Sequence, residues 1–202
     1  MEKHILITIG RQFGSGGKPV GDALSRKLGI PVYDNELITE AAKQSGYSPE
    51  LFIRSDEKKR SFFLANLFGL SSDVRNMIGD AELFRIQSET IRNLASKGSA
   101  IFVGRASDYV LRDMKCLNVF ITASMESRIK FVCERDGVAL EDAPGIIERR
   151  DRNRSKYYDF FTQKHWGLAS NYDICINSPP LERKRPRTLS LSSGKCAALF
   201  SE

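Results

Sequence analysis

The stretch Gly10–Pro19 contains the residue types that bind phosphate groups. It reads GRQFGSGGKP and lies between the apolar run Ile5–Ile9 and a helical pattern. Its glycines let backbone N–H groups converge on an anion, and a helix that begins there adds the positive end of its dipole. The predicted phosphate-binding residues are Gly14, Ser15, Gly16, Gly17 and Lys18.

This loop matches the strict phosphate-loop pattern only in part. The pattern is G-x-x-x-x-G-K-[ST], whereas here the residue five before Gly17 is Gln12 and the residue after Lys18 is Pro19. Because proline has no hydroxyl to hold magnesium, Ser15 or a water is the expected substitute. Glycine-rich turns also occur at structural junctions, and that alternative stays open.

A second concentration of charge lies at residues 149–154, where four arginines surround one aspartate: Arg149, Arg150, Asp151, Arg152 and Arg154. Phosphoryl transfer needs cations around the moving group and a fixed geometry between donor and acceptor. The segment therefore predicts a site for a small anionic ligand. The alternative is a solvated helix face.

Short apolar runs that could form strands alternate with longer helical patterns. The predicted strands are His4–Ile9, Pro31–Tyr33, Ala100–Val103, Leu117–Ile121 and Tyr172–Ile176. Because these runs are continuously apolar, both faces of the sheet should be covered. The expected fold class is α/β, with a five-stranded parallel sheet and helices on both faces.

Four helices and a longer helical region are predicted between the strands. The helices run from Pro19 to Gly29, over Asn35–Gln44, over Ser124–Asp136, and from Leu140 to about Lys164. Ser48–Lys97 contains no convincing strand and indicates a helical insertion. Its apolar residues suit a core, an acceptor pocket or a dimer interface, so a homodimer stays open: Phe62, Phe63, Leu67 and Phe68.

The composition favours one domain in a reducing compartment. The chain has 202 residues, 41% of them hydrophobic; nothing near its first residues resembles a signal peptide, and no apolar stretch is expected to span a bilayer. Its four cysteines are scattered and do not form a metal or disulfide pattern. A cytoplasmic location with no membrane partner is expected.

Residues 179–202 differ in composition and periodicity from the rest of the chain. They are rich in proline, serine and basic residues and have no periodic face, so disorder is expected. This tail supplies three of the six net positive charges, with five basic and two acidic residues. It is either a basic interaction tail or an altered reading frame. Nucleic-acid binding is disfavoured because no aromatic residues are interleaved with the charges.

Five segments between His4 and Asn177 carry a family resemblance: ITIGRQFGSGGKPVGDALSRKLGIPVYDNELI, IFVGRASDYVL, NVFITASMESRIKFV, RRDRNRSKYYDFFT and HWGLASNYDICINS. Together they resemble the cytidylate-kinase-like family of P-loop nucleoside-monophosphate kinases. The resemblance implies a three-layer P-loop NTPase fold over residues 1–178. It also implies a helical acceptor-binding insertion at about 35–97 and a lid at about 148–166.

The resemblance assigns catalytic roles to the two charged regions. Arg150 and Arg154 would clamp phosphates and Asp151 would orient them. Counting from Leu28 and Asp34 puts Gly17 where the family has its lysine, so the catalytic Lys18 is displaced by one position. Either Lys18 still reaches the phosphates through an altered turn, or another cation substitutes for it.

Four further residues receive roles by the same resemblance. Arg105 would grip the acceptor monophosphate, and Asp108 would hold Arg105 or contact the acceptor, unless it caps a helix. Asp34 lies where it could bind magnesium, alongside Ser15, or help to bind the acceptor; as a plain helix N-cap it would look the same. Arg128 would face the adenine of the nucleotide, or else form a surface salt bridge.

The resulting hypothesis is an enzyme that transfers the γ-phosphate of ATP to a nucleoside monophosphate. CMP or dCMP is the favoured acceptor by resemblance, with ATP and Mg²⁺ as cofactors. The alternative is a P-loop nucleotide-binding regulatory protein with little or no kinase activity, and the displaced Lys18 and the following Pro19 support it.

Overall fold

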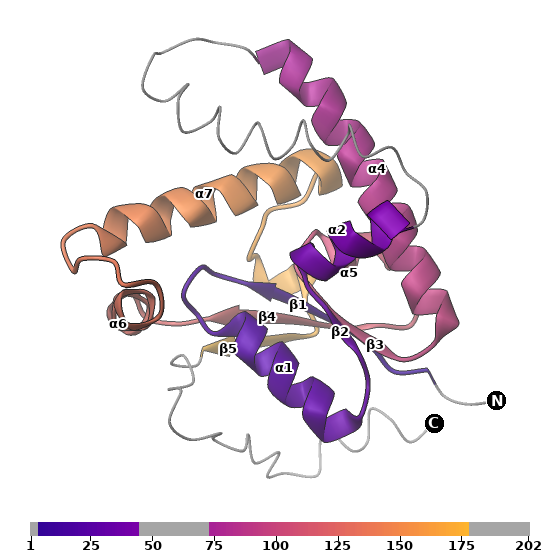
Figure 1. The fold of residues 1–202 in the computed structure, drawn as a ribbon, viewed down its shortest axis with the longest axis horizontal. Coiled ribbons are helices and arrows are strands. Elements are labelled where there is room, and N and C mark those ends of the chain that lie inside the picture. The colour runs from indigo at the N-terminus through magenta and orange to yellow at the C-terminus, as the bar shows by residue number, and fades with distance from the viewer. Residues whose placement is uncertain (1–3, 45–72, 178–202) are drawn as a thin grey trace.

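The computed structural model describes residues 4–44 and 73–177, which form a parallel sheet enclosed by helices (Figure 1). The strands are β1 (Leu6–Arg11), β2 (Val32–Tyr33), β3 (Ala100–Val103), β4 (Leu117–Thr122) and β5 (Ile174–Asn177). They run in the order β2-β3-β1-β4-β5, and every neighbouring pair is parallel. The predicted five-stranded parallel sheet is confirmed.

β1 extends two residues further than the apolar pattern predicts. Gly10 and Arg11 continue the strand because they pair with Phe120 and Ile121 of β4. This pairing depends on the neighbouring strand, so the hydrophobic pattern of the segment itself does not indicate it. The side chain of Arg11 is consequently fixed at the carboxyl end of the sheet.

The helices follow the predicted order, and the ends of all but α2 are shifted. They are α1 (Gly17–Leu28), α2 (Asn35–Gln44), α4 (Asp73–Lys97), α5 (Ser107–Val110), α6 (Met125–Asp136) and α7 (Ala143–Thr162). α1 begins two residues before Pro19, because Gly16 adopts a left-handed conformation that turns the chain into the helix. α5 was not predicted, since a helix of four residues is too short to show a periodic pattern.

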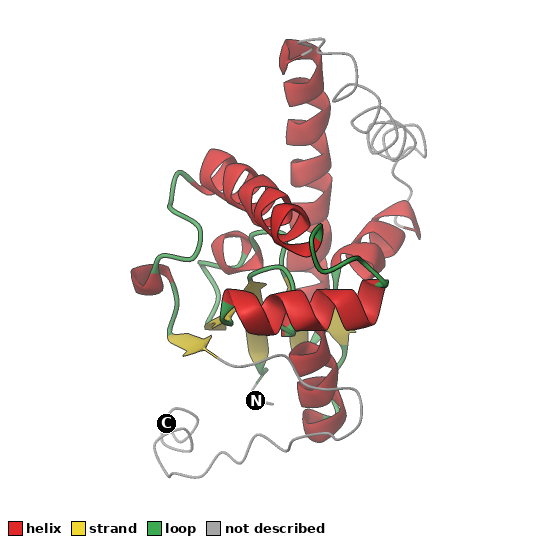
Figure 2. Ribbon diagram, turned by 90° about the vertical axis from the view of Figure 1, so that its left-hand side faces the viewer, coloured by secondary structure: helices red, strands yellow, loops and turns green. Residues whose placement is uncertain are grey.

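The sheet separates two apolar clusters. Figure 2 shows helices on both sides of the strands. One side of β1 carries Ile7 and Ile9, which belong to a cluster that includes Val20 and Leu24 of α1. The other side carries Leu6, in a cluster with Ile38 of α2 and residues of α4 and α5. Successive side chains of a strand point to opposite faces, so the fold has three layers.

Several predictions fall on residues outside the described ranges. These are most of the first half of the helical insertion, with its four apolar side chains at 62–68, and the tail at 179–202. The domain limits therefore stay predictions. Within the part of the chain that the structure describes, α2 and α4 of the insertion pack against each other, and no helix is long and apolar enough to cross a membrane.

Candidate active site

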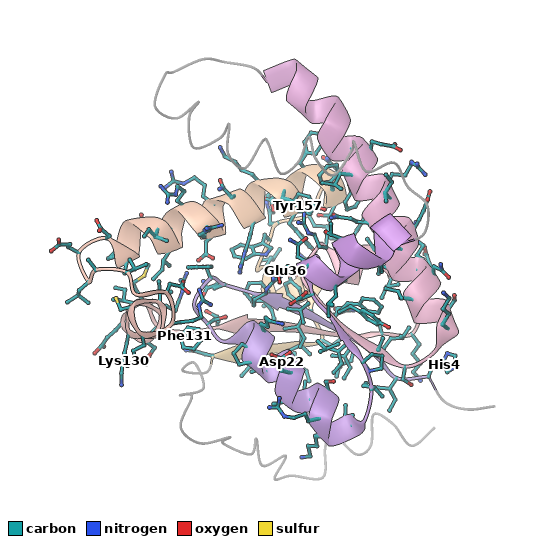
Figure 3. The ribbon with its side chains drawn as sticks, in the orientation of Figure 1. His4, Asp22, Glu36, Lys130, Phe131 and Tyr157 are labelled. Carbon is teal, nitrogen blue, oxygen red and sulfur yellow. The ribbon has the colours of Figure 1, made fainter. Side chains whose placement is uncertain are left out.

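The carboxyl ends of β1 and β3 open into a cavity of about 330 Å³ beneath α7. Figures 1 and 3 show α7 crossing above this end of the sheet, with Tyr157 among the side chains between them. The cavity lining combines cations, amides and aromatic rings: Gly10, Arg11, Phe13, Asn35, Gly104, Arg105, Ala106, Ser107, Asp108, Arg150, Asn153, Arg154, Tyr157, Tyr158, Trp166 and Tyr172. Ligands of open α/β sheets bind at this edge.

A larger depression of about 590 Å³ lies over α6 and is lined by Glu126, Ile129, Lys130, Cys133, Glu134 and Leu140. It is open, and no arginine or glycine-rich backbone converges on it. The smaller cavity at the sheet edge is therefore the candidate site.

The predicted phosphate loop turns tightly between β1 and α1. Gly14 and Gly16 have φ angles of 79° and 83°, a conformation that favours glycine. A Cβ at Gly14 would lie 3.1 Å from the backbone oxygen of Arg128. The first turn of α1 contains no acidic residue, and no side chain caps it. The loop and the start of α1 thus present backbone N–H groups to an anion.

Ser15 ties this loop to the sheet. Its hydroxyl lies 2.9 Å from the carbonyl oxygen of Gln12 and 3.0 Å from that of Ile121, and the residue is 1% exposed. A buried hydroxyl between two carbonyl acceptors is oriented toward β4 and away from the cavity. Its position indicates a structural role and does not favour the predicted metal contact.

Lys18 points toward Asp34 and does not line the cavity. Its Nζ lies 2.6 Å from Oδ2 of Asp34 and 3.8 Å from Oδ1 of Asp22. The hydrogen bond to Asp34 raises the pKa of Lys18 against the opposing effect of burial. The ammonium group is consequently engaged by carboxylates in this arrangement.

Asp34 caps a helix, as one of its predicted alternatives has it, and also forms an ion pair that was not predicted. Its Oδ1 accepts hydrogen bonds from the backbone N–H groups of Glu36 and Leu37, both at 3.1 Å, as a helix cap does. Its Oδ2 pairs with Lys18. Burial would raise the pKa of Asp34, but these hydrogen bonds outweigh it and hold the pKa below its ordinary value.

The two residues predicted to bind magnesium do not form a metal site as the structure places them. The Ser15 hydroxyl faces β4, and both Asp34 oxygens accept hydrogen bonds. Among the residues that the structure describes, no group of three or more His, Cys, Asp or Glu could hold a metal ion. As the structure places them, both side chains are engaged by protein partners, and their predicted contact with magnesium stays a prediction.

Arg11 is a site residue that the sequence analysis missed. Its guanidinium lies against Gly104, where an added Cβ would be only 1.7 Å from Nη1. Burial lowers the pKa of Arg11 to about 9, with contributions from Arg154 and Arg105, so the group stays cationic at neutral pH. The available signal was the position of Arg11, six residues before Gly17: when the lysine of the strict pattern is aligned with Gly17, its first glycine falls on Arg11.

Arg128 and Asp151 hold the tip of the phosphate loop. Asp151 Oδ1 accepts from the N–H of Phe13 at 2.6 Å, and Arg128 Nε donates to the carbonyl oxygen of Phe13 at 2.8 Å. Nη2 of Arg128 pairs with Oδ2 of Asp151. Arg128 is 4% exposed, so this contact is a buried ion pair and not the predicted surface salt bridge, while the contact with adenine stays a prediction. Asp151 orients the loop backbone as well as the arginine.

Arg150 and Arg154, the predicted phosphate clamp, both lie beside the loop. Their guanidinium carbons lie 5.7 and 5.5 Å from the centre of the Phe13 ring, and Nη1 of Arg154 donates to the carbonyl oxygen of Arg11 at 2.9 Å. Burial lowers the pKa of Arg154 to about 10, and three neighbouring arginines add to the effect against Asp151. Clustered positive charge of this kind favours an anionic ligand.

Arg105 and Asp108 face the cavity from the turn after β3. Gly104, Arg105 and Ala106 have φ angles of 82°, 59° and 49°, and three left-handed residues in succession turn the chain sharply into α5. Arg105 Nε donates to Oδ1 of Asn35, which leaves its two terminal nitrogens for another acceptor.

Asp108 is paired with a tyrosine, in contrast to the predicted contact with Arg105. Its Oδ2 accepts a hydrogen bond of 2.7 Å from the hydroxyl of Tyr158 on α7. Burial raises the pKa of Asp108, although this hydrogen bond opposes the shift. The contact joins α7 to the turn after β3.

The fold is that of a P-loop kinase: a glycine-rich loop follows β1, a helix carrying arginines lies above it, and a cavity opens at the carboxyl edge of a parallel sheet. The sequence confirms this class. Residues 6–179 match the model of the cytidylate kinase-like family, so the chain belongs to that family. The matched region ends beside the predicted start of the tail.

Two relatives of this chain in sequence are named cytidylate kinase and share about a quarter of its residues. Cytidylate kinase of Methanopyrus kandleri is 26% identical over 184 residues, covering 86% of this chain and 84% of that protein. Cytidylate kinase of Pyrococcus horikoshii is 25% identical over 180 residues, covering 86% and 80%. Family membership and fold together support a nucleotide kinase.

Solved structures agree on the fold. An uncharacterized protein from Eubacterium ventriosum is 30% identical, with a TM-score of 0.65, and the match covers 86% of this chain and 87% of that one. Shikimate kinase from Bacteroides thetaiotaomicron has a TM-score of 0.50 at 14% identity, over 90% of each chain. The latter likeness concerns the fold alone.

Proposed function

We propose that this protein transfers the γ-phosphate of ATP to a nucleoside monophosphate, with CMP or dCMP as the favoured acceptor. The observation that supports this most strongly is the convergence of Arg11, Arg105 and Arg154 on one cavity beside a glycine-rich loop. Among residues 4–44 and 73–177, no carboxylate pairs with any of these three guanidinium groups. Partly buried cations that lack a carboxylate within ion-pair distance favour a ligand with several negative charges.

In the proposed reaction, an oxygen of the acceptor phosphate attacks the γ-phosphorus of ATP. A new P–O bond forms as the bond to the β–γ bridging oxygen breaks, and ADP leaves with that electron pair. The protein positions the groups and stabilises charge, which is most of what this chemistry needs. ATP would bring Mg²⁺ on its own phosphate oxygens, and no step here depends on a protein ligand to the ion.

Each group of residues has a distinct place in this proposal. The backbone of Gly14–Lys18 would bind the donor phosphates, and Arg105 would grip the acceptor phosphate with its two terminal nitrogens. Arg150 and Arg154 would clamp both from α7. The ring of Tyr157, 5.5 Å from the guanidinium carbon of Arg105, offers a flat surface to the acceptor base.

The first experiment would supply Mg-ATP with CMP, dCMP, UMP, AMP or GMP and measure ADP release against a reaction without acceptor. Release that depends on a pyrimidine monophosphate, and that falls at least tenfold in Arg105→Gln, is the expected result. The matched control is Arg112→Gln, because Arg112 is a neighbouring arginine outside the cavity. ADP release that is the same with every acceptor and with none would contradict the proposal.

A regulatory nucleotide-binding protein is the second candidate. The observation in its favour is the engagement of Lys18 by Asp34, which keeps that ammonium group out of the cavity. This candidate predicts that folded protein binds ATP yet releases no ADP with any acceptor in the panel.

A further inference from the structure

Compared with the strict phosphate-loop pattern, positions 11 and 17 have exchanged residue types, glycine for a cationic residue and a cationic residue for glycine. If the lysine of G-x-x-x-x-G-K is aligned with Gly17, the second glycine falls on Gly16 and the first glycine falls on Arg11. A residue with a long cationic side chain thus occupies the first glycine position, and a glycine occupies the lysine position.

The two substitutions are coupled in space. A Cβ added to Gly17 would lie 2.6 Å from both Cβ and Cγ of Arg11, a separation that real Cβ atoms essentially never show. The atoms in the way are the stem of Arg11 next to its backbone, which cannot swing aside as a side-chain end can. Any side chain at position 17 would therefore require Arg11 to move.

From this stem the guanidinium of Arg11 reaches across to the turn after β3. An added Cβ at Gly104 would be 1.7 Å from Nη1 and 2.7 Å from Cζ of Arg11. The side chain consequently runs from the start of α1, where donor phosphates would bind, to the turn that carries Arg105. That is the path along which a phosphoryl group would pass between donor and acceptor.

The competing cation, Lys18, lacks this position. It is 56% exposed, bonded to Asp34 and absent from the cavity lining, whereas Arg11 lines the cavity and forms no ion pair within the described part of the chain. A guanidinium group also offers two parallel N–H donors to a phosphate, which a lysine does not.

We propose that Arg11, rather than Lys18, supplies the cation that contacts the terminal phosphoryl group of the nucleotide, and that position 17 is glycine because the side chain of Arg11 fills its space. This inference rests on the proposed function, since it assigns a residue to the same site. In this protein the phosphate-binding cation therefore comes from the end of β1, and not from the start of α1.

The test measures binding of ATP and of inorganic tripolyphosphate by calorimetry, without acceptor, so that turnover does not enter. Arg11→Gln should weaken ATP binding by about 10- to 100-fold, the usual effect of losing a hydrogen-bonded charge. Arg11→Lys should recover only part of this loss. Arg85→Gln, on the exposed face of α4, is the matched control and should bind as the unaltered protein does. Thermal unfolding of each variant separates binding from folding.

Exchanging the residue types of positions 11 and 17 gives a more specific test. Gly17→Lys alone should lose ATP affinity because the new side chain collides with Arg11, and the double variant Arg11→Gly/Gly17→Lys should bind at least tenfold more tightly than either single variant. The inference is overturned if Arg11→Gln binds ATP normally, if Lys18→Ala alone abolishes binding, or if the folded double variant binds no better than the singles. Unaltered protein that binds neither ATP nor tripolyphosphate would overturn the proposed function and this inference with it.

Discussion

The contact of Arg128 and Asp151 with Phe13 leads to a quantitative prediction about stability. Replacing Asp151 by alanine would leave the Arg128 guanidinium, which is 4% exposed, without its carboxylate, and would remove the acceptor of the Phe13 N–H. Breaking a buried pair by removing one partner costs about 3–5 kcal/mol. For a domain of this size that corresponds to a fall in Tm of about 6–20 °C.

Thermal unfolding followed by circular dichroism at pH 7 measures this fall directly. Asp136→Ala is the matched control, since it breaks a solvent-exposed pair with Arg135 on α6 and should cost less than about 1 kcal/mol. Asp151→Asn should lie between them, because an amide oxygen still accepts from the N–H of Phe13. If Asp151→Ala melts within 2 °C of Asp136→Ala, the pair does not hold the loop and the reasoning is refuted.

Two further predictions concern the turn after β3. Gly104→Ala should lower Tm because residue 104 has a φ of 82°, and it should lower ATP affinity because the new Cβ would displace the guanidinium of Arg11. The control is Gly98→Ala, which should bind ATP normally because nothing lies within 4 Å of the added Cβ. Asp108→Asn should gain stability relative to unaltered protein as the pH rises from 4 to 7, measured by urea unfolding. Because the pKa of Asp108 is higher in the folded than in the unfolded protein, protonated Asp108 adds stability at pH values below its unfolded-state pKa of about 3.9. Unaltered protein loses this added stability as the pH rises through the folded-state pKa, whereas Asp108→Asn has none to lose. An equal difference at both pH values would contradict the second prediction.

The sequence was sufficient for the order and type of most elements. The run Ala100–Val103 is a strand with the predicted limits, and Asn35–Gln44 is a helix with the predicted limits. These segments are determined by local apolar periodicity, which the sequence displays directly. The strand ends that depend on pairing, such as Gly10 and Arg11, could not be found in this way.

Side-chain partners were harder to predict, because they join positions far apart in the chain. The sequence could not decide between a cap and a ligand at Asp34, and the structure shows a cap that also binds Lys18. Nor could it place Arg128 against Phe13, which lies 115 residues away. Tyr158 was missed as the partner of Asp108 for the same reason.

By itself the sequence determined that a glycine-rich loop follows the first strand and that arginines gather near residue 150. It also determined the resemblance to a kinase family. Local pattern and residue type are sufficient for all three conclusions. Only the tertiary structure decided which cation enters the cavity. The side chains of Arg11 and Lys18 differ in direction because one leaves the end of a strand and the other the first turn of a helix. The direction of each side chain follows from the packing of β1 between β3 and β4 and from the carboxylate of Asp34, which holds Lys18 aside.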